Sequence, residues 1–175
     1  MRKHLAAALC ALVLASALTP AARAEETSSR VYPSGQTILL NGEYKELHAY
    51  ARRNSQGFLT NYVKVRDMAA LLNPTTARFD VTWDGSVVIT SGKAYRSQNG
   101  QENQAPYEGE QPYHPAIADT MIDGQRVNLD AFVIYDDEGN GSTYYKLRDL
   151  AQTLDFYVTW TDGGMLIDTS IPYRD

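Results

Sequence analysis

The acidic segment at positions 136–141, with the sequence Asp-Asp-Glu-Gly-Asn-Gly, holds the side chains best suited to bind a cation. Oxygen ligands at alternate positions resemble the start of a calcium-binding loop, which makes Asp136, Glu138 and Asn140 candidate ligands. Such a loop needs a bidentate Glu at its twelfth position, where this chain has Leu147. The main interpretation is therefore a solvated hairpin tip, with a calcium site as the alternative.

Other site chemistries find little support among the histidines, serines and glycines. After position 24 the chain has two histidines, His48 and His114, and no cysteine, whereas zinc and copper sites need several N or S ligands. There is no Gly-x-Ser-x-Gly elbow and no phosphate-binding glycine loop. The sequence thus predicts a protein without a catalytic site, metal or other cofactor. A small secreted hydrolase that uses Asp136, Asp137 or His48 is an alternative.

Aromatic side chains are the other candidates for ligand binding. The chain has 12 tyrosines, and Tyr107, Tyr113, Tyr135 and Tyr157 fall in an expected linker or on expected polar strand faces. Flat amphipathic rings in such positions can contact a glycan or a protein. These four tyrosines form the predicted binding face, while most of the others are expected inside the sheet.

The N-terminal segment 1–24 has the pattern of a cleavable secretory signal peptide. Arg2 and Lys3 precede an apolar run at 5–18 that is too short to span a bilayer, and residues 22–24 (Ala-Arg-Ala) match a cleavage site. An uncleaved anchor is the alternative. We expect the mature chain to start at Glu25 and to have no membrane span. It is expected to be secreted or extracellular, with attachment to the cell wall as a further option.

Cleavage would make an acidic chain more acidic. The full chain has 16 basic and 21 acidic residues and a formal net charge of −5, and loss of the segment 1–24 removes three basic residues and no acid, which gives −8. Binding to phosphate requires clustered Lys and Arg, so this composition argues against nucleic acid and anionic lipid as partners. Cys10 would leave with the signal, so stability has to come from apolar burial.

Most of the remaining chain is one unit used twice. Gly42 is as far along the chain from Gly124 as Arg66 is from Arg148. In each copy an Asn-Gly or Asp-Gly turn opens a hairpin, a strand leads into a short helix, and a strand of alternating apolar residues follows. The predicted apolar helix faces are Val65, Met68, Ala69 and Leu72 in the first copy, and Leu147, Leu150, Ala151 and Leu154 in the second.

These elements predict an α+β fold of two repeats, each a twisted antiparallel sheet curled around one short α-helix. The repeats are expected at 25–96 and 119–175, with a linker rich in Pro, Gly and Gln at 97–118. Trp83 and Trp160 end alternating strands, which predicts both as core residues, with exposed sugar-stacking platforms as the alternative. Since each copy is too small to be stable alone, we expect the two copies to dock.

The order of these motifs resembles the copper amine oxidase N-terminal-like, or stalk, domain family. The segments 61–67, 81–85 and 145–151 carry the resemblance, which covers nearly the whole chain after position 24 as two tandem repeats. It implies a twisted antiparallel sheet around a helix in an exported protein of Gram-positive bacteria. It does not imply oxidase chemistry, because in the oxidases the copper and the quinone belong to a separate catalytic domain that has no counterpart here.

Together these features predict an exported, non-catalytic interaction module at or near the bacterial cell envelope. Its partner would be an unidentified surface protein or a cell-wall polymer. Binding of a glycan through exposed tyrosines is the alternative.

Overall fold

The computed structural model describes residues 29–34, 36–97, 100, 102, 108–162 and 164–174. The predicted signal peptide at 1–24 and the candidate binding residue Tyr107 lie outside these residues. Within the part of the chain that is described, no helix has both the length and the apolar character needed to span a bilayer.

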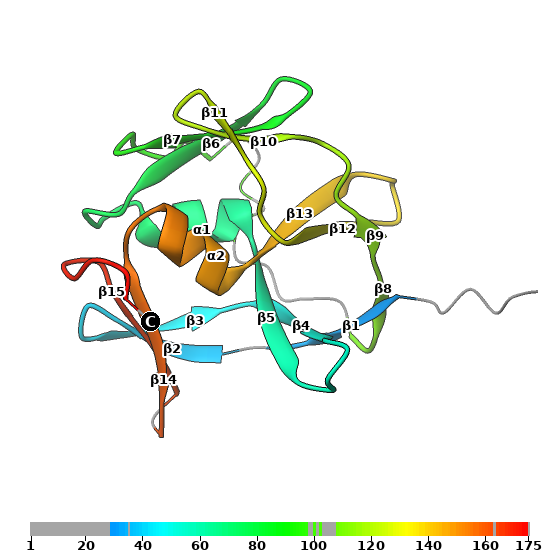
Figure 1. The fold of residues 1–175 in the computed structure, drawn as a ribbon, viewed down its shortest axis with the longest axis horizontal. Helices are drawn as coiled ribbons and strands as arrows, with labels where there is room; N and C mark the ends of the chain where they lie inside the picture. The colour runs from blue at the N-terminus through cyan, green and yellow to red at the C-terminus, as the bar shows by residue number, and fades with distance from the viewer. Residues whose placement is uncertain are drawn as a thin grey trace, which may run out of the picture.

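The two copies run through similar elements in a similar order (Figure 1). The first copy contains β1 (Arg30–Pro33), β2 (Gln36–Leu40), β3 (Glu43–Leu47), β4 (Ala49–Arg53), β5 (Leu59–Lys64), α1 (Val65–Leu72), β6 (Phe79–Trp83) and β7 (Val87–Ser91). After it come β8 (Gln111–Pro112), β9 (His114–Pro115), β10 (Thr120–Ile122), β11 (Gln125–Val127), β12 (Ala131–Tyr135), β13 (Gly141–Lys146), α2 (Leu147–Thr153), β14 (Tyr157–Thr161) and β15 (Gly164–Asp168).

Tight turns open the hairpins at the predicted positions. Asn41 and Asp123 have φ angles of 49° and 50°, and the glycines that follow, Gly42 and Gly124, have φ angles of 87° and 80°. Two successive residues with positive φ are the signature of a type I′ turn, whose twist matches that of the flanking strands. The predicted hairpins, β2–β3 and β10–β11, are confirmed.

Both helices bury the apolar face that their spacing predicts. Seven of the eight predicted residues are at most 4% exposed, and Leu154 is half-buried. Asp67 and Asp149 lie in the first turns, where a negative charge is favoured. The helices have only 8 and 7 residues, so packing against the sheets has to stabilise them.

The largest sheet has seven strands in the order β8-β1-β4-β5-β13-β12-β9. At its centre β5 of the first copy pairs with β13 of the second, with Val63 opposite Tyr145. Its two edge strands, β8 and β9, are consecutive in the chain: β8 pairs with β1, β9 pairs with β12, and only Tyr113 separates them. One short segment inside the expected linker therefore lies at both edges, and the sheet closes on itself.

The two copies exchange hairpins. In one four-stranded sheet, β11-β10-β7-β6, the opening hairpin of the second copy joins the closing hairpin of the first through a parallel pairing of β10 and β7. In the other, β14-β15-β2-β3, the opening hairpin of the first copy joins the closing hairpin of the second through a parallel pairing of β15 and β2. Figure 1 shows both helices at the centre of the view, with the first of these sheets above them.

The predicted fold class is therefore wrong. Of the residues that the structure describes, 48% lie in strands and 11% in helices, and the strands form several sheets that draw on both copies. Neither copy curls its own sheet around its own helix, because each opening hairpin pairs with the other copy. The molecule is mostly β, not an α+β pair of repeats.

The closed seven-stranded sheet has a second core, which contains no residue of either helix. Its face turned away from the helices carries the buried rings of Tyr62 and Phe132, with centroids 4.8 Å apart, and half-buried Tyr144 packs on Phe132 with 5.5 Å between centroids. Asp130 links the copies beside this cluster, since it accepts hydrogen bonds from Arg52 at 2.6 and 2.9 Å and from Tyr62 at 2.6 Å. The buried members of the cluster are Val31, Tyr50, Tyr62, Phe132 and Ile134.

The prediction that both tryptophans are core residues is also wrong. Trp83 is 58% exposed and Trp160 is 42% exposed. Trp83 does follow the period of two after Phe79 and Val81, which are buried. It is the last residue of β6, however, and it lies beside the first residues of α1, where the core ends.

Candidate functional site

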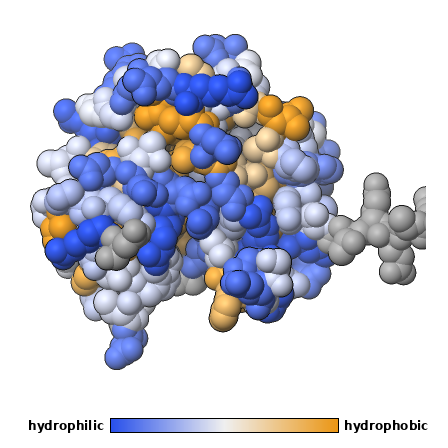
Figure 2. All heavy atoms as spheres, viewed as in Figure 1, coloured by the Kyte–Doolittle hydropathy of each residue, from blue (hydrophilic) through white to orange (hydrophobic). Residues whose placement is uncertain are grey.

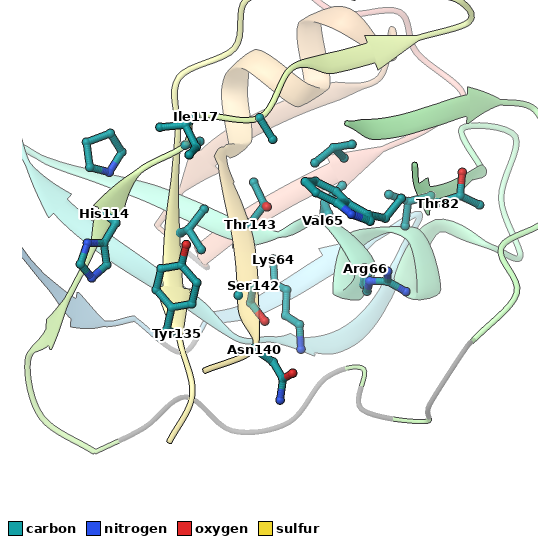
Figure 3. Close-up of a pocket in the computed structure, with 18 residues that line it drawn as sticks. Lys64, Val65, Arg66, Thr82, His114, Ile117, Tyr135, Asn140, Ser142 and Thr143 are labelled. Atoms are coloured by element: carbon teal, nitrogen blue, oxygen red, sulfur yellow. The ribbon is translucent and has the colours of Figure 1, made fainter. Parts of the chain in front are cut away.

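A groove opens where the start of α1 meets β6 and β7, the chain between β9 and β10, and the hairpin of β12 and β13 (Figure 3). Its volume is about 770 Å³, within the range of small-molecule sites. The first copy supplies α1, β6 and β7, and the rest comes from the chain that follows it. The groove exists because the copies are interleaved.

Large apolar side chains stand exposed around this groove. Tyr135 is 50% exposed and Ile117 is 93% exposed, in addition to Trp83. The His114 ring meets Tyr135 nearly edge-on, with 5.3 Å between centroids, and Figure 3 shows the two rings together at one end of the groove. In Figure 2 the chain between β9 and β10 forms an orange patch on a largely blue face. Exposed apolar groups gathered in one hollow are typical of binding sites.

The ring of Tyr135 is positioned by a glycine on the neighbouring strand. Gly141 lies directly opposite Tyr135 in the register of β12 and β13. A Cβ atom at Gly141 would come within 3.1 Å of Tyr135 Cε1 and within 3.0 Å of Val133 Cγ1. The absence of a side chain at Gly141 is thus what allows the aromatic ring to lie across β13.

Hydroxyl and amide groups line the groove as well. Ser142 and Thr143 lie near the start of β13, Asn140 immediately precedes that strand, and Thr82 comes from β6. These groups can both donate and accept hydrogen bonds. None of the described residues that line the groove is Asp or Glu.

Two cations, Lys64 and Arg66, flank the first residue of α1 in the groove. The Nη1 atom of Arg66 is buried and has no hydrogen-bond partner. The same guanidinium hydrogen-bonds the hydroxyl of Tyr95, which in turn donates to Oε1 of Glu102 at 2.5 Å. Tyr95 therefore holds Arg66 in place while one guanidinium nitrogen keeps an unused donor.

Because of the Tyr95 hydroxyl, the stability of the fold should vary with pH in the alkaline range. Burial, together with the hydrogen bond to Glu102, raises the pKa of Tyr95 from 10.0 to about 12. The folded state then keeps a proton that the unfolded state loses, so the stabilisation is complete below about pH 10 and declines as the pH rises towards about 12.

Replacing Tyr95 with Phe should remove this part of the pH dependence. We expect the difference in free energy of unfolding between the wild type and Tyr95→Phe to be smaller at about pH 11.5 than at about pH 9, by urea denaturation. Tyr62 and Tyr145 also have raised pKa values, caused mainly by burial, and both are present in the two proteins, so the comparison isolates Tyr95. A difference that stays constant with pH would contradict this role.

The second copy has the same Lys, Arg and Trp but uses them differently. Both lysines pair with the Asp three residues later, Lys146 with Asp149 at 2.9 Å and Lys64 with Asp67 at 3.8 Å. The guanidinium carbon of Arg148 lies 5.3 Å from the ring centroid of Trp160. No cation–π contact joins Arg66 to Trp83 within the described residues. Among the described residues, the Arg and the Trp therefore contact each other in the second copy but not in the first.

The proposed calcium ligands lie at the tip of the hairpin of β12 and β13, near the groove. Oδ1 of Asp136 accepts a hydrogen bond from the backbone N–H of Asn140 at 2.6 Å, and Oδ2 accepts one from its side-chain amide at 3.0 Å. These bonds lower the pKa of Asp136. Glu138 is exposed in the same turn. In the residues that the structure describes, no three His, Cys, Asp or Glu side chains gather as a metal site would require.

The candidate tyrosines do not form one face. Tyr135 lies in the groove, but Tyr113 is half-buried and packs on Phe132 with 5.0 Å between ring centroids. Tyr157 lies on β14 in another sheet, where Arg174 stacks 4.8 Å from its ring centroid.

The remaining candidates from the sequence are also separated. His48 is half-buried between β3 and β4, and Asp137 is exposed at the tip of the β12–β13 hairpin. Of His48 and His114, only His114 lines the groove.

The sequence analysis missed Ile117 and Arg66 as groove residues, and it gave Trp83 an exposed sugar-stacking role only as the alternative. One signal could have indicated part of the site: Ile117 and Tyr135 differ between the copies, since the corresponding first-copy positions hold Gly35 and Arg53. Residues that only one copy needs are candidates for a role beyond the shared fold.

Comparisons with models of protein families, with curated proteins and with solved structures find no match for this chain. The resemblance to the copper amine oxidase N-terminal-like family stays a prediction.

Proposed function

We propose that the protein is an exported, non-catalytic binding module that acts at or near the bacterial cell envelope and holds a saccharide in the groove. The observation that carries the proposal is the exposure of Trp83 and Tyr135 around one groove of about 770 Å³. The apolar face of a sugar ring packs on such aromatic rings, while its hydroxyl groups exchange hydrogen bonds with neutral polar side chains.

The neutral polar groups of the groove support the same ligand class. Asn140, Ser142, Thr143 and Thr82 are all uncharged and offer both donors and acceptors, as a sugar's hydroxyl groups require. Among its described lining residues, the groove lacks the pair of carboxylates that hydrolysis of a glycosidic bond ordinarily uses. Binding without cleavage is therefore the activity that these side chains favour.

Loss of Trp83 should abolish most of the binding. We expect Trp83→Ala to weaken binding to purified cell-wall polysaccharide by about tenfold or more, because a large exposed ring in a groove is typical of binding hot spots. Tyr135→Ala should weaken binding as well. The affinity can be measured by isothermal titration calorimetry with the full chain.

Trp160→Ala is the matched control, since it removes the same side chain from the corresponding strand of the other copy, outside this groove. Its affinity should equal that of the wild type. Equal losses in Trp83→Ala and Trp160→Ala, or no binding by the wild type to any saccharide offered, would contradict the proposal.

Association with a surface protein is the second candidate, and a separate patch favours it. Phe58 and Leu59, at the tip of the β4–β5 hairpin, are 67% and 57% exposed. The corresponding tip of the second copy has Asn140 and Gly141 at these positions. Loss of partner capture in Phe58→Ala, with the Trp83→Ala variant unaffected, would favour a protein partner.

A further inference from the structure

The charge of the groove differs from that of the rest of the chain. The whole chain has 21 acidic and 16 basic residues. The groove is lined by Lys64 and Arg66, and by no carboxylate among the described residues. Figure 3 shows both Arg66 and Thr82 at the end of the groove away from the His114 and Tyr135 rings. The cations and the aromatic pair therefore lie at different places along one hollow.

Arg66 has an unused donor at this place. Nη1 is buried without a hydrogen-bond partner, although buried guanidinium N–H groups are normally paired. The guanidinium is also held by the Tyr95 hydroxyl, which limits its freedom to turn towards solvent. A negatively charged oxygen is the partner that best satisfies such a donor, because hydrogen bonds between charged groups are short and strong.

The second copy shows what the same residues do when no ligand is expected. There Arg148 stacks on Trp160. In the first copy, among the described residues, Arg66 makes no such contact and the face of Trp83 is not covered by a cation. The groove thus keeps an aromatic face and a cation separate, as a ligand with an apolar face and an anionic group requires.

From this we infer that the saccharide bound in the groove is acidic: its ring packs among the exposed aromatic side chains, and its anionic group reaches Arg66 and Lys64. The inference rests on the proposed function and narrows its ligand class. The anionic group is a carboxylate, as in a uronic acid, or a phosphate on a sugar, and both present oxygen acceptors to a guanidinium.

Titration of the full chain with three probes of equal length tests the inference. The probes are trigalacturonate, maltotriose and phosphorylated maltotriose. We expect at least one acidic probe to bind about tenfold more tightly than the neutral one, and the stronger of the two acidic probes identifies the anionic group. In Arg66→Gln this preference should fall to about twofold or less, because the acidic probe loses more affinity than maltotriose does.

Arg148→Gln is the matched control and should keep the full preference. If Arg66→Gln does not fold, as judged by circular dichroism, Lys64→Gln provides the second variant and should reduce the preference in part. Equal binding of acidic and neutral probes by the wild type would overturn the inference, as would equal effects of Arg66→Gln and Arg148→Gln. Trp83-dependent binding without a charge preference would leave the proposed function intact, whereas no binding of any probe would count against both.

Discussion

Residues 25–96 produced alone are expected to remain unfolded. In the full chain, β2, β5 and β7 of this segment each pair with a strand that lies after position 96: β15, β13 and β10. Without those partners the buried side chains of Ile38, Val63 and Ile89 would face water. A segment of this size with one short helix and isolated hairpins does not bury enough surface to fold.

Circular dichroism and urea denaturation of the 25–96 segment should show little secondary structure and no cooperative transition, whereas the full chain should unfold in one transition. Adding the segment 97–175 should restore structure, because the missing pairings can form between the two segments. A cooperative transition in the isolated segment would show that the exchange of hairpins is not needed for folding.

Phe132→Ala is expected to lower the free energy of unfolding by about 3–5 kcal/mol. Phe132 is completely buried within the closed seven-stranded sheet, where its ring contacts those of Tyr62, Tyr113 and Tyr144. It also lies opposite Pro115 of β9, so the cavity would form where the sheet closes. The measurement is urea denaturation, followed by both fluorescence and circular dichroism.

Phe58→Ala removes an identical side chain from an exposed position and should change the free energy of unfolding by no more than about 0.5 kcal/mol. If Phe132→Ala also cost less than about 1 kcal/mol, the interior of the closed sheet would not be a core. The pair of variants therefore separates burial in the closed sheet from the general cost of losing an aromatic ring.

Local features of this fold could be predicted, and long-range pairing could not. The Asn41-Gly42 turn and the buried faces of α1 and α2 follow from residue type and spacing within a few positions. The choice of partner for each hairpin does not follow from residue type and spacing. Because the two copies are similar, β7 and β15 have similar sequence patterns. The pattern of β2 therefore does not indicate which of the two strands it pairs with.

The tryptophans show the same limit. Alternation correctly puts Trp83 on the face of Phe79 and Val81, but it does not show that Trp83 lies at the start of α1, where the core ends. The groove is assembled from α1, two sheets and the chain between β9 and β10, so no spacing within one segment could indicate it. Among the described residues, Tyr135 is the one predicted binding tyrosine that lines it.

Because the copies exchange hairpins, the stability of two unlinked copies would depend on protein concentration. Two separate chains of one copy each would have to meet before either could complete its sheets, and their stability would fall as the protein became more dilute. Joining both copies in one polypeptide makes that encounter intramolecular, at a high effective concentration set by the tether. The groove, which both copies build, should therefore persist when the protein is diluted.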